Sequence, residues 1–136
     1  GQNRSLNRTQ WHAAHIDDQL ANGETPMAQV FFELRRRLDI RTRQKAFHPD
    51  ATQFTLHIKP GMFGFWRQSL DRRQSLFVVT NITRENKRLS LRDMNLFADT
   101  KWVDLLSGVT VNPEDEELEL VPYQTVWISN EEKDVR

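Results

Sequence analysis

The sequence predicts an α+β protein in which N-terminal helices precede an antiparallel β-sandwich. Apolar residues recur at helical spacing as far as the segment Ala46-Phe47-His48-Pro49. Beyond that proline, short apolar segments alternate with polar residues and are separated by turn-forming residues. One amphipathic helix that ends at a proline is too little to form the core of an enzyme. We therefore expect the helices to belong to a larger α/β domain.

Three parts are expected along the chain. Residues 1–48 form the terminal helical segment of an upstream domain, residues 49–130 form a C-terminal β-sandwich, and residues 131–136 form a tail. The sequence starts at Gly1, within a polar run and without an initiator methionine. We interpret it as the C-terminal piece of an enzyme whose reactive residues lie upstream.

Two helices are predicted in the first part. A short one spans 9–20, and a longer one runs from Pro26 to about Lys45. Thr25 is a favourable N-cap for the longer helix, and proline is well tolerated at the first helical position. This helix carries an apolar face, because Met27, Phe31, Leu34 and Leu38 follow one another at spacings of four, three and four.

The second part has the pattern of several short strands. The segment 76–79 is continuously apolar, which is typical of a strand that is buried on both faces. Turn-forming residues separate the segments, as at 59–61 and 112–113. The other predicted strands are 54–58, 62–66, 89–91, 102–106, 109–111, 118–120 and 126–128.

Composition excludes several classes of function. The 136 residues hold 19 Lys+Arg and 19 Asp+Glu, so no net charge favours nucleic acid or a membrane surface as a partner. The absence of cysteine excludes disulfides and zinc–thiolate sites and is compatible with a reducing cytoplasm, where we expect the protein. No apolar run approaches the roughly 20 residues of a membrane-spanning helix.

No motif for nucleotide, metal or cofactor binding occurs, and we expect neither a metal nor a cofactor. His12 and His15 are three residues apart on the first helix, but no third ligand is evident, so we interpret them as surface residues. His48 suggests packing at a hinge, and His57 is expected on a polar strand face. The acidic stretch 114–117 lacks the spacing of a calcium loop and fits a solvated hairpin tip better.

Two further features leave alternatives open. The basic residues between Arg35 and Lys45 are spread over several helix faces, which favours a solvated face with some arginines paired to the missing domain over phosphate binding. The large aromatic residues can form either a core or a sugar-stacking platform, and their place within strand patterns favours the core. These aromatic residues are Trp66, Trp102, Tyr123 and Trp127.

Three stretches together resemble the C-terminal region of sucrose phosphorylase-like enzymes of the α-amylase superfamily, glycoside hydrolase family thirteen. Residues 3–8, Asn-Arg-Ser-Leu-Asn-Arg, resemble the Gly-Arg-x-Ile-Asn-Arg motif that follows the last barrel strand there. The longer helix, which ends in the segment 46–49, resembles the final helix of the (β/α)8 barrel. The segments 63–67 and 77–83 resemble the start of the small C-terminal β-domain.

The resemblance implies a parent enzyme in which an aspartate nucleophile, a glutamate acid/base and a second aspartate act on an α-glucoside substrate. None of the three is matched in this chain, so the fragment is expected to be inactive and to contain no catalytic residue. The motif of residues 3–8 implies that Arg4, Asn7 and Arg8 contribute to substrate binding in the parent. Asn3 replaces the glycine of the motif, and Leu6 replaces its isoleucine.

The resulting prediction is a non-catalytic β-domain that stabilises the upstream barrel of the same chain or assists its assembly. The parent carries out glucosyl transfer of the sucrose phosphorylase kind or α-glucosidase hydrolysis, two alternatives that the residues leave open. An autonomous carbohydrate-binding module, and a protein or nucleic-acid interaction domain using the Arg-rich helix, are the competing hypotheses. Without the barrel, apolar residues of the helix at 26–46 are uncovered, so we expect the chain to self-associate there.

Overall fold

The computed structural model describes residues 9–94, 96 and 100–130. The chain divides between Asp39 and Ile40 into two compact units, and each is described by itself. The first contains α1 (Ala13–Ala21) and most of α2 (Pro26–Thr42). The second contains the last residues of α2 and all the strands. No helix within the described residues is long and apolar enough to cross a bilayer.

Thr25 caps α2 as the sequence predicts. Its hydroxyl accepts a hydrogen bond from the amide of Ala28 at 3.2 Å and donates one to the carbonyl of Gln19 at 2.7 Å. The first bond pairs one of the amides left free at a helix start. The second holds the end of α1 against the beginning of α2, so this threonine fixes the connection between the two helices.

Both helices differ in extent from the sequence prediction. The first begins at Ala13 rather than residue 9, and α2 ends at Thr42, with a separate 3₁₀ turn, η1 (Lys45–Phe47), replacing its expected last residues. Gln44 is extended, and the amide of Ala46 bonds to the side chain of Gln74 at 2.8 Å instead of to a helical carbonyl. The helix therefore ends earlier than Pro49 requires, and the backbone after it bonds to a side chain distant in sequence.

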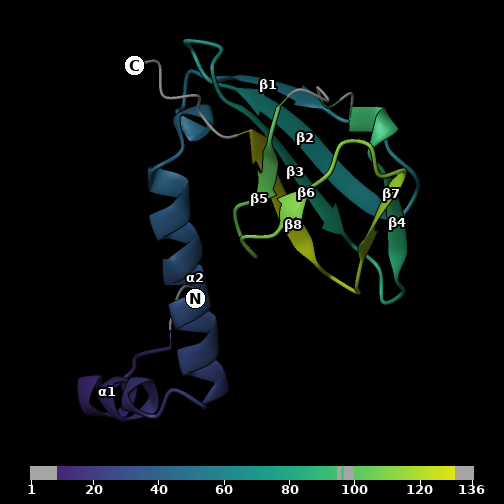
Figure 1. The fold of residues 1–136 in the computed structure, drawn as a ribbon. Coiled ribbons are helices and arrows are strands. Elements are labelled where there is room, and N and C mark those ends of the chain that lie inside the picture. Colours follow the sequence, from purple (N-terminus) through teal and green to yellow (C-terminus); the bar gives the residue numbers. More distant parts are fainter. Residues whose placement is uncertain (1–8, 95, 97–99, 131–136) are drawn as a thin grey trace, which may run out of the picture. The chain divides into compact units, whose positions relative to one another are not determined.

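The second unit is built on an antiparallel sheet of six strands in the order β1-β2-β3-β8-β5-β6 (Figure 1). The central strands β3 and β8 contain the continuous apolar run 76–79 and the segment 126–128, as predicted. The strands are β1 (Thr52–Thr55), β2 (Met62–Gln68), β3 (Ser75–Asn81), β5 (Trp102–Asp104), β6 (Thr110–Val111) and β8 (Thr125–Asn130).

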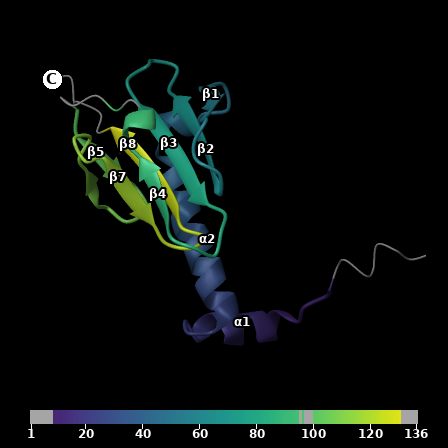
Figure 2. The same ribbon diagram turned by 90° about the vertical axis from the view of Figure 1, so that its right-hand side faces the viewer.

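A second layer consists of β4 (Lys87–Ser90) and β7 (Glu117–Leu120), which pair with each other (Figure 2). Leu89 and Leu120 of this layer are fully buried. They form one apolar cluster with residues on the inner face of the large sheet, including Phe77, Val79 and Ile128. The expected arrangement, helices followed by an antiparallel sandwich, is confirmed.

Three predicted strands are shorter than expected, one of them the segment 109–111, which is β6. The segment 102–106 leaves the sheet after Asp104, whose carboxylate accepts hydrogen bonds from the amides of Leu106 and Ser107 at 3.2 Å each. That local pairing closes a turn. The Leu105 amide still bonds to the carbonyl of Trp127 at 2.9 Å, but the Trp127 amide bonds to the Asp104 carboxylate at 2.8 Å. The strand predicted at 54–58 is β1 (Thr52–Thr55), which lies at the edge of the sheet.

Candidate functional site

The predicted substrate-binding residues Arg4, Asn7 and Arg8 lie outside the described residues, as does the predicted tail 131–136. Within the described ranges, no group of three or more His, Asp or Glu side chains is arranged to hold a metal ion. His12 and His15 are exposed at the start of α1, as expected of surface residues. The remaining candidates for a functional site among the described residues are exposed surfaces and buried polar networks.

Arg67 of β2 holds the segment that connects the last helical turn to the sheet. Its guanidinium donates to the carbonyls of Ala46 and His48 at 2.7 Å each and to that of Ala51 at 3.3 Å. It also reaches the side-chain oxygen of Gln53 at 3.0 Å. The planar fork of arginine suits several acceptors at once, which a lysine ammonium matches poorly. We call residues 44–51, held in this way, the junction.

Gln74, which is 5% exposed, binds the junction from the other side. Its side-chain oxygen accepts the Ala46 amide, and its nitrogen donates to Gln44 at 2.7 Å and to the hydroxyl of Ser129 at 3.1 Å. Ala46 is fully buried, and both its amide and its carbonyl are bound by side chains of the sheet, Gln74 and Arg67. The junction is therefore a fixed part of the β-domain and not a loose linker.

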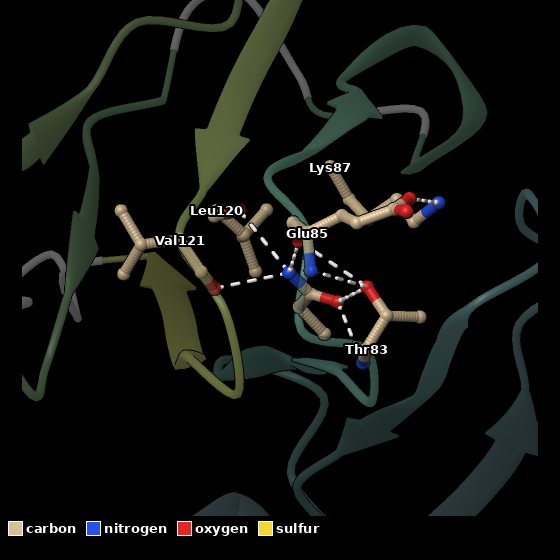
Figure 3. Close-up of polar contacts among 6 residues, drawn as sticks. Thr83, Glu85, Lys87, Leu120 and Val121 are labelled. Atoms are coloured by element: carbon tan, nitrogen blue, oxygen red, sulfur yellow. Dashed lines mark hydrogen bonds and ion pairs between the residues drawn. The ribbon is translucent and has the colours of Figure 1, made fainter.

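Asn81, at the end of β3, connects the two layers of the sandwich, and Figure 3 labels its partners Thr83, Glu85, Leu120 and Val121. Its amide nitrogen donates to the carbonyls of Glu85, Val121 and Leu120 at 2.7, 3.0 and 3.3 Å. Its oxygen accepts from the amide and the hydroxyl of Thr83 at 3.0 and 2.8 Å. Because the side chain is fully buried and fully paired, it fixes the β3–β4 connection against the end of β7.

The helical unit leaves an apolar surface uncovered. Of the described residues of α2, Ala28 alone is buried. Val30, Leu34 and Leu38 are 69%, 56% and 47% exposed, and Phe31 is also exposed. At 100° per residue, these side chains share one side of the helix with Met27. A shallow cavity of about 220 Å³ between the helices continues this surface and is lined by Trp11, Ile16, Leu20, Met27 and Phe31.

The outer face of the large sheet is covered over only part of its area. Near the junction, Leu76 and Val78 are buried under Ala46 and Phe47, and Phe47 packs edge-on against Trp127. Toward the other end, Phe63 lies on the same face, opposite Thr80, and is 55% exposed. The β-domain thus presents an uncovered strip with an aromatic residue on this face.

The outer surface of the small layer has a different character. Its acidic residues pair with nearby basic side chains: Glu117 with Lys59 at 3.3 Å, and Glu116 with Arg92 at 3.3 Å. The acidic stretch is exposed, as a solvated tip should be. Such exposed pairs contribute little to stability but keep a surface hydrated. The sandwich therefore has one apolar outer side and one charged side.

The large aromatic side chains are mostly part of the core. Trp102 is 2% exposed, and Trp66 is stacked between Phe54 and Phe77, with ring centroids 5.0 and 6.0 Å away. Both faces of the Trp66 ring are therefore occupied by other rings. Of the four candidates for a sugar platform, Tyr123 alone is strongly exposed, and a single ring does not make a platform.

The basic run of α2 is partly neutralised within the helix. Arg36 and Arg37 both bind the carboxylate of Glu33, at 2.8 and 2.7 Å. Hydrogen bonds from these two arginines lower the pKa of Glu33 from 4.5 to about 2. The pairing takes two cations away from any continuous phosphate-binding stripe. This observation agrees with the expected solvated face.

The networks around Arg67, Gln74 and Asn81 are not evident from sequence patterns. Arg67 and Asn81 lie inside the segments 63–67 and 77–83 that carry the family resemblance. An asparagine two residues after a continuously apolar run is the one available signal, since a buried amide needs several partners. Gln74 has no such signal, because its partners lie 28 to 55 residues away in the sequence.

Comparison with known proteins identifies one curated relative. The chain is 27% identical over 129 residues to glucosylglycerate phosphorylase from Escherichia coli (strain K12). The match covers 94% of this chain but 21% of the relative, so the chain spans about a fifth of that protein's length. No family model matches the chain.

Solved structures share the fold at low sequence identity. An α-amylase from Anoxybacillus aligns with a TM-score of 0.64 over 85% of this chain and 25% of its own, at 17% identity. AmyP in complex with maltose aligns with a TM-score of 0.62 over 76% of this chain and 20% of its own, at 14% identity. The resemblance to α-amylase-superfamily enzymes is confirmed, and the chain is similar to a part of a glycoside-hydrolase-type enzyme.

Proposed function

We propose that this chain is a non-catalytic C-terminal β-domain, with the last barrel helices attached, of a cytoplasmic α-glucoside-active enzyme. Its role is to cover and stabilise the (β/α)8 barrel of the same protein. The observation that carries the proposal is the apolar side of α2, where Val30, Leu34 and Leu38 are about half exposed or more. Apolar surface of this kind commonly marks a protein interface.

The surface of the β-domain also supports a role in covering the barrel. Its two outer sides differ, since the small layer carries internally paired charges and the large sheet carries the exposed Phe63. This asymmetry is expected of a domain that faces solvent on one side and packs against a barrel on the other. The junction, held by Arg67 and Gln74, gives the sheet a fixed attachment to the last turn of α2.

For the parent, we propose phosphorolysis of a small α-glucoside in the manner of sucrose phosphorylase, because the curated relative is itself a phosphorylase. A retaining mechanism needs one carboxylate as nucleophile and a second as acid/base, both supplied by the barrel. Arg4, Asn7 and Arg8 would then contribute to the glucose subsite. Hydrolysis of the same class of substrate is the alternative.

The coding region upstream of Gly1 tests this proposal directly. We expect it to encode barrel strands followed by loops that carry an aspartate, a glutamate and a second aspartate. An unrelated upstream sequence would contradict the accessory role. The purified 136-residue chain should show no turnover of sucrose or aryl α-glucosides, with or without phosphate, beyond a boiled control. Activity in the chain alone would require a carboxylate pair within it.

The isolated chain should also self-associate through the segment 26–46, because the apolar face is then without its barrel. A second copy would be a substitute for the natural partner, so this association is a consequence of the proposal and not a separate function.

A further inference from the structure

The connection between α1 and α2 contains the one Asn-Gly pair of the sequence, Asn22-Gly23. In such a pair, the backbone amide nitrogen of the glycine can attack the side-chain carbonyl carbon of the asparagine. The attack is intramolecular and closes a succinimide ring, so it needs no enzyme. Both residues are exposed to solvent, and Asn22 is the C-cap of α1.

The attacking nitrogen is unhindered and has no hydrogen-bond acceptor. Within the described residues, the Gly23 amide donates no hydrogen bond, whereas the Asn22 amide before it bonds to the carbonyl of Asp18 at 3.3 Å. Apart from the chain neighbours of Gly23, no heavy atom lies within 4 Å of the position that a Cβ would take there. The Gly23 nitrogen is therefore free to lose its proton and to approach the side chain of Asn22.

The carbonyl group under attack is polarised by the backbone. The side-chain oxygen of Asn22 accepts a hydrogen bond from the Glu24 amide at 3.2 Å. Negative charge develops on this oxygen when the ring closes, and an N–H donor that is already in place stabilises it. The side-chain nitrogen of Asn22, which must leave, donates no hydrogen bond within the described part of the chain. The turn thus combines a free nucleophile, a polarised carbonyl and an unbound leaving group.

We propose that Asn22 is a site of spontaneous deamidation, in which water replaces the side-chain amide by a carboxylate. The Gly23 nitrogen forms a bond to Cγ of Asn22, the Cγ–Nδ2 bond breaks, and the proton lost by the nitrogen passes through water to the departing ammonia. Water then opens the succinimide. Cleavage between the nitrogen and Cγ gives aspartate, and cleavage between the nitrogen and the original main-chain carbonyl carbon gives isoaspartate. No electrons are transferred, and water is the only co-reactant.

Two other asparagines each lack one of these features. Asn112 is exposed and has the same polarising bond, from the amide of Glu114 at 3.1 Å. Pro113 follows it, however, and has no N–H to lose. Asn81 is buried, and both its side-chain nitrogen and its side-chain oxygen are hydrogen-bonded. Asn112 is therefore an internal control for the nucleophile, and Asn81 is one for exposure.

Deamidation changes the connection between the helices in two ways. It places a negative charge at the C-terminal end of α1, where the helix dipole disfavours it. In the isoaspartate form, the main chain also passes through the side-chain carbons, and the carbonyl of Asn22 that accepts the Thr25 amide at 3.1 Å becomes part of a free carboxylate. Thr25 holds the two helices together through Gln19 and Ala28, so we expect the modified connection to be looser.

The test is peptide mass spectrometry of the whole chain after storage in mildly alkaline buffer, either native or unfolded in urea. Asn22 should be converted before any other asparagine, and Asn112 should stay unmodified. The native rate at Asn22 should lie within about fivefold of the unfolded rate, because the fold leaves the reacting groups free. A larger difference would show that the fold protects Asn22. That result, or earlier conversion of another asparagine, would overturn the proposal.

Gly23→Ala tests the role of the free nitrogen without disturbing the fold. Gly23 has no positive φ and the added methyl group meets no neighbouring segment, so the melting temperature should not change. Conversion of Asn22 should become at least about tenfold slower, because the methyl group crowds the attacking nitrogen. Glu24→Ala is the matched control, since it alters an exposed side chain of the same turn but keeps every backbone group. Equal rates in the two variants would contradict the assigned nucleophile.

Asn22→Asp separates the effect of charge from that of the longer main chain. Amide exchange at Ala28, whose amide bonds to Thr25, should be at least about threefold faster in chains with isoaspartate than in Asn22→Asp. The unaltered chain should exchange most slowly. Equal exchange in all of these forms would show that the connection tolerates the modification, and the structural consequence assigned to the site would be wrong.

Discussion

The guanidinium of Arg67 donates hydrogen bonds to the carbonyls of Ala46 and His48 at the same distance, 2.7 Å. One residue of β2 thus fixes two points of the chain about twenty residues earlier in the sequence. Together with Gln74, which accepts the Ala46 amide, it attaches the junction to the sheet. The same pair of residues holds the chain between the end of α2 at Thr42 and the start of β1 at Thr52.

Arg67→Lys should destabilise the β-domain by about 1–3 kcal/mol, because one ammonium leaves at least one buried carbonyl unpaired. Urea unfolding, followed by tryptophan fluorescence, measures the loss. Amide exchange should also become faster at Phe47–Ala51 by more than the global loss of stability accounts for. Arg88→Lys, on an exposed strand, is the control and should change neither quantity. Uniform acceleration over the whole sheet would show that Arg67 has no special relation to the junction.

Asn81 connects the two layers of the sandwich in the way that Arg67 connects the junction to the sheet. Asn81→Asp should destabilise the sandwich by at least about 3 kcal/mol, because a carboxylate would face the three carbonyls that now accept from the amide, and each would lose its donor. The urea midpoint reports the change. Asn86→Ala removes an exposed hydrogen bond to Glu119 and should cost well under 1 kcal/mol. Similar midpoints for the two variants would contradict the role assigned to Asn81.

The hydrogen-bond networks of Arg67, Gln74 and Asn81 could not be predicted from the sequence. Periodicity predicted α2, its cap at Thr25, and the central strands, since each depends on residues close together in the chain. The bond from the Ala46 amide just after α2 goes to Gln74, 28 residues further along the chain, and no local pattern contains that information. The turn after Asp104 was predicted to start later, at Ser107 and Gly108, because Leu105 and Leu106 are apolar and look like part of the strand, while the carboxylate already closes the turn.

Less of the candidate site than of the fold could be predicted from the sequence. The family resemblance directed attention to Arg4, Asn7 and Arg8, which lie outside the described residues. Its motifs also include Arg67 and Asn81, whose observed contacts are structural. The basic run between Arg35 and Lys45 looked uniform in sequence, yet Glu33 binds Arg36 and Arg37 and neutralises the first part of the run. Only the side-chain positions in the structure show which arginines of this run are paired with Glu33.

Glu33 provides a test that depends on pH. Its pKa of about 2, against 4.5 for the free group, means that the folded form holds the carboxylate ionised. The Arg36 and Arg37 pairs therefore contribute to stability above pH 4.5, and the contribution is lost as the pH falls from 4.5 toward 2. Because the pairs are exposed, the loss should not exceed about 1 kcal/mol.

Carbon-detected NMR of the Glu33 carboxyl group measures the titration midpoint. Arg36→Gln with Arg37→Gln should raise it toward 4.5, since the two hydrogen bonds are the main cause of the shift. Arg35→Gln removes one charge from the neighbouring position and should leave the midpoint near its original value. A midpoint close to 4.5 in the unaltered protein would mean that the ion pairs do not persist in solution.

The apolar side of α2 gives the last prediction, which separates a barrel helix from a helix that completes its own domain. Phe31→Glu places a charge among Val30, Leu34 and Leu38, which are exposed in the single chain. Burying that charge in an interface between copies is costly, so the variant should sediment as a monomer where the unaltered chain associates. The sheet, whose core excludes Phe31, should melt at an unchanged temperature. Gln29→Glu adds the same charge on the opposite side of α2 and should leave association intact. A monomeric wild type together with an unfolded Phe31→Glu would instead show that the helix packs within its own domain, and the proposed barrel interface would be wrong.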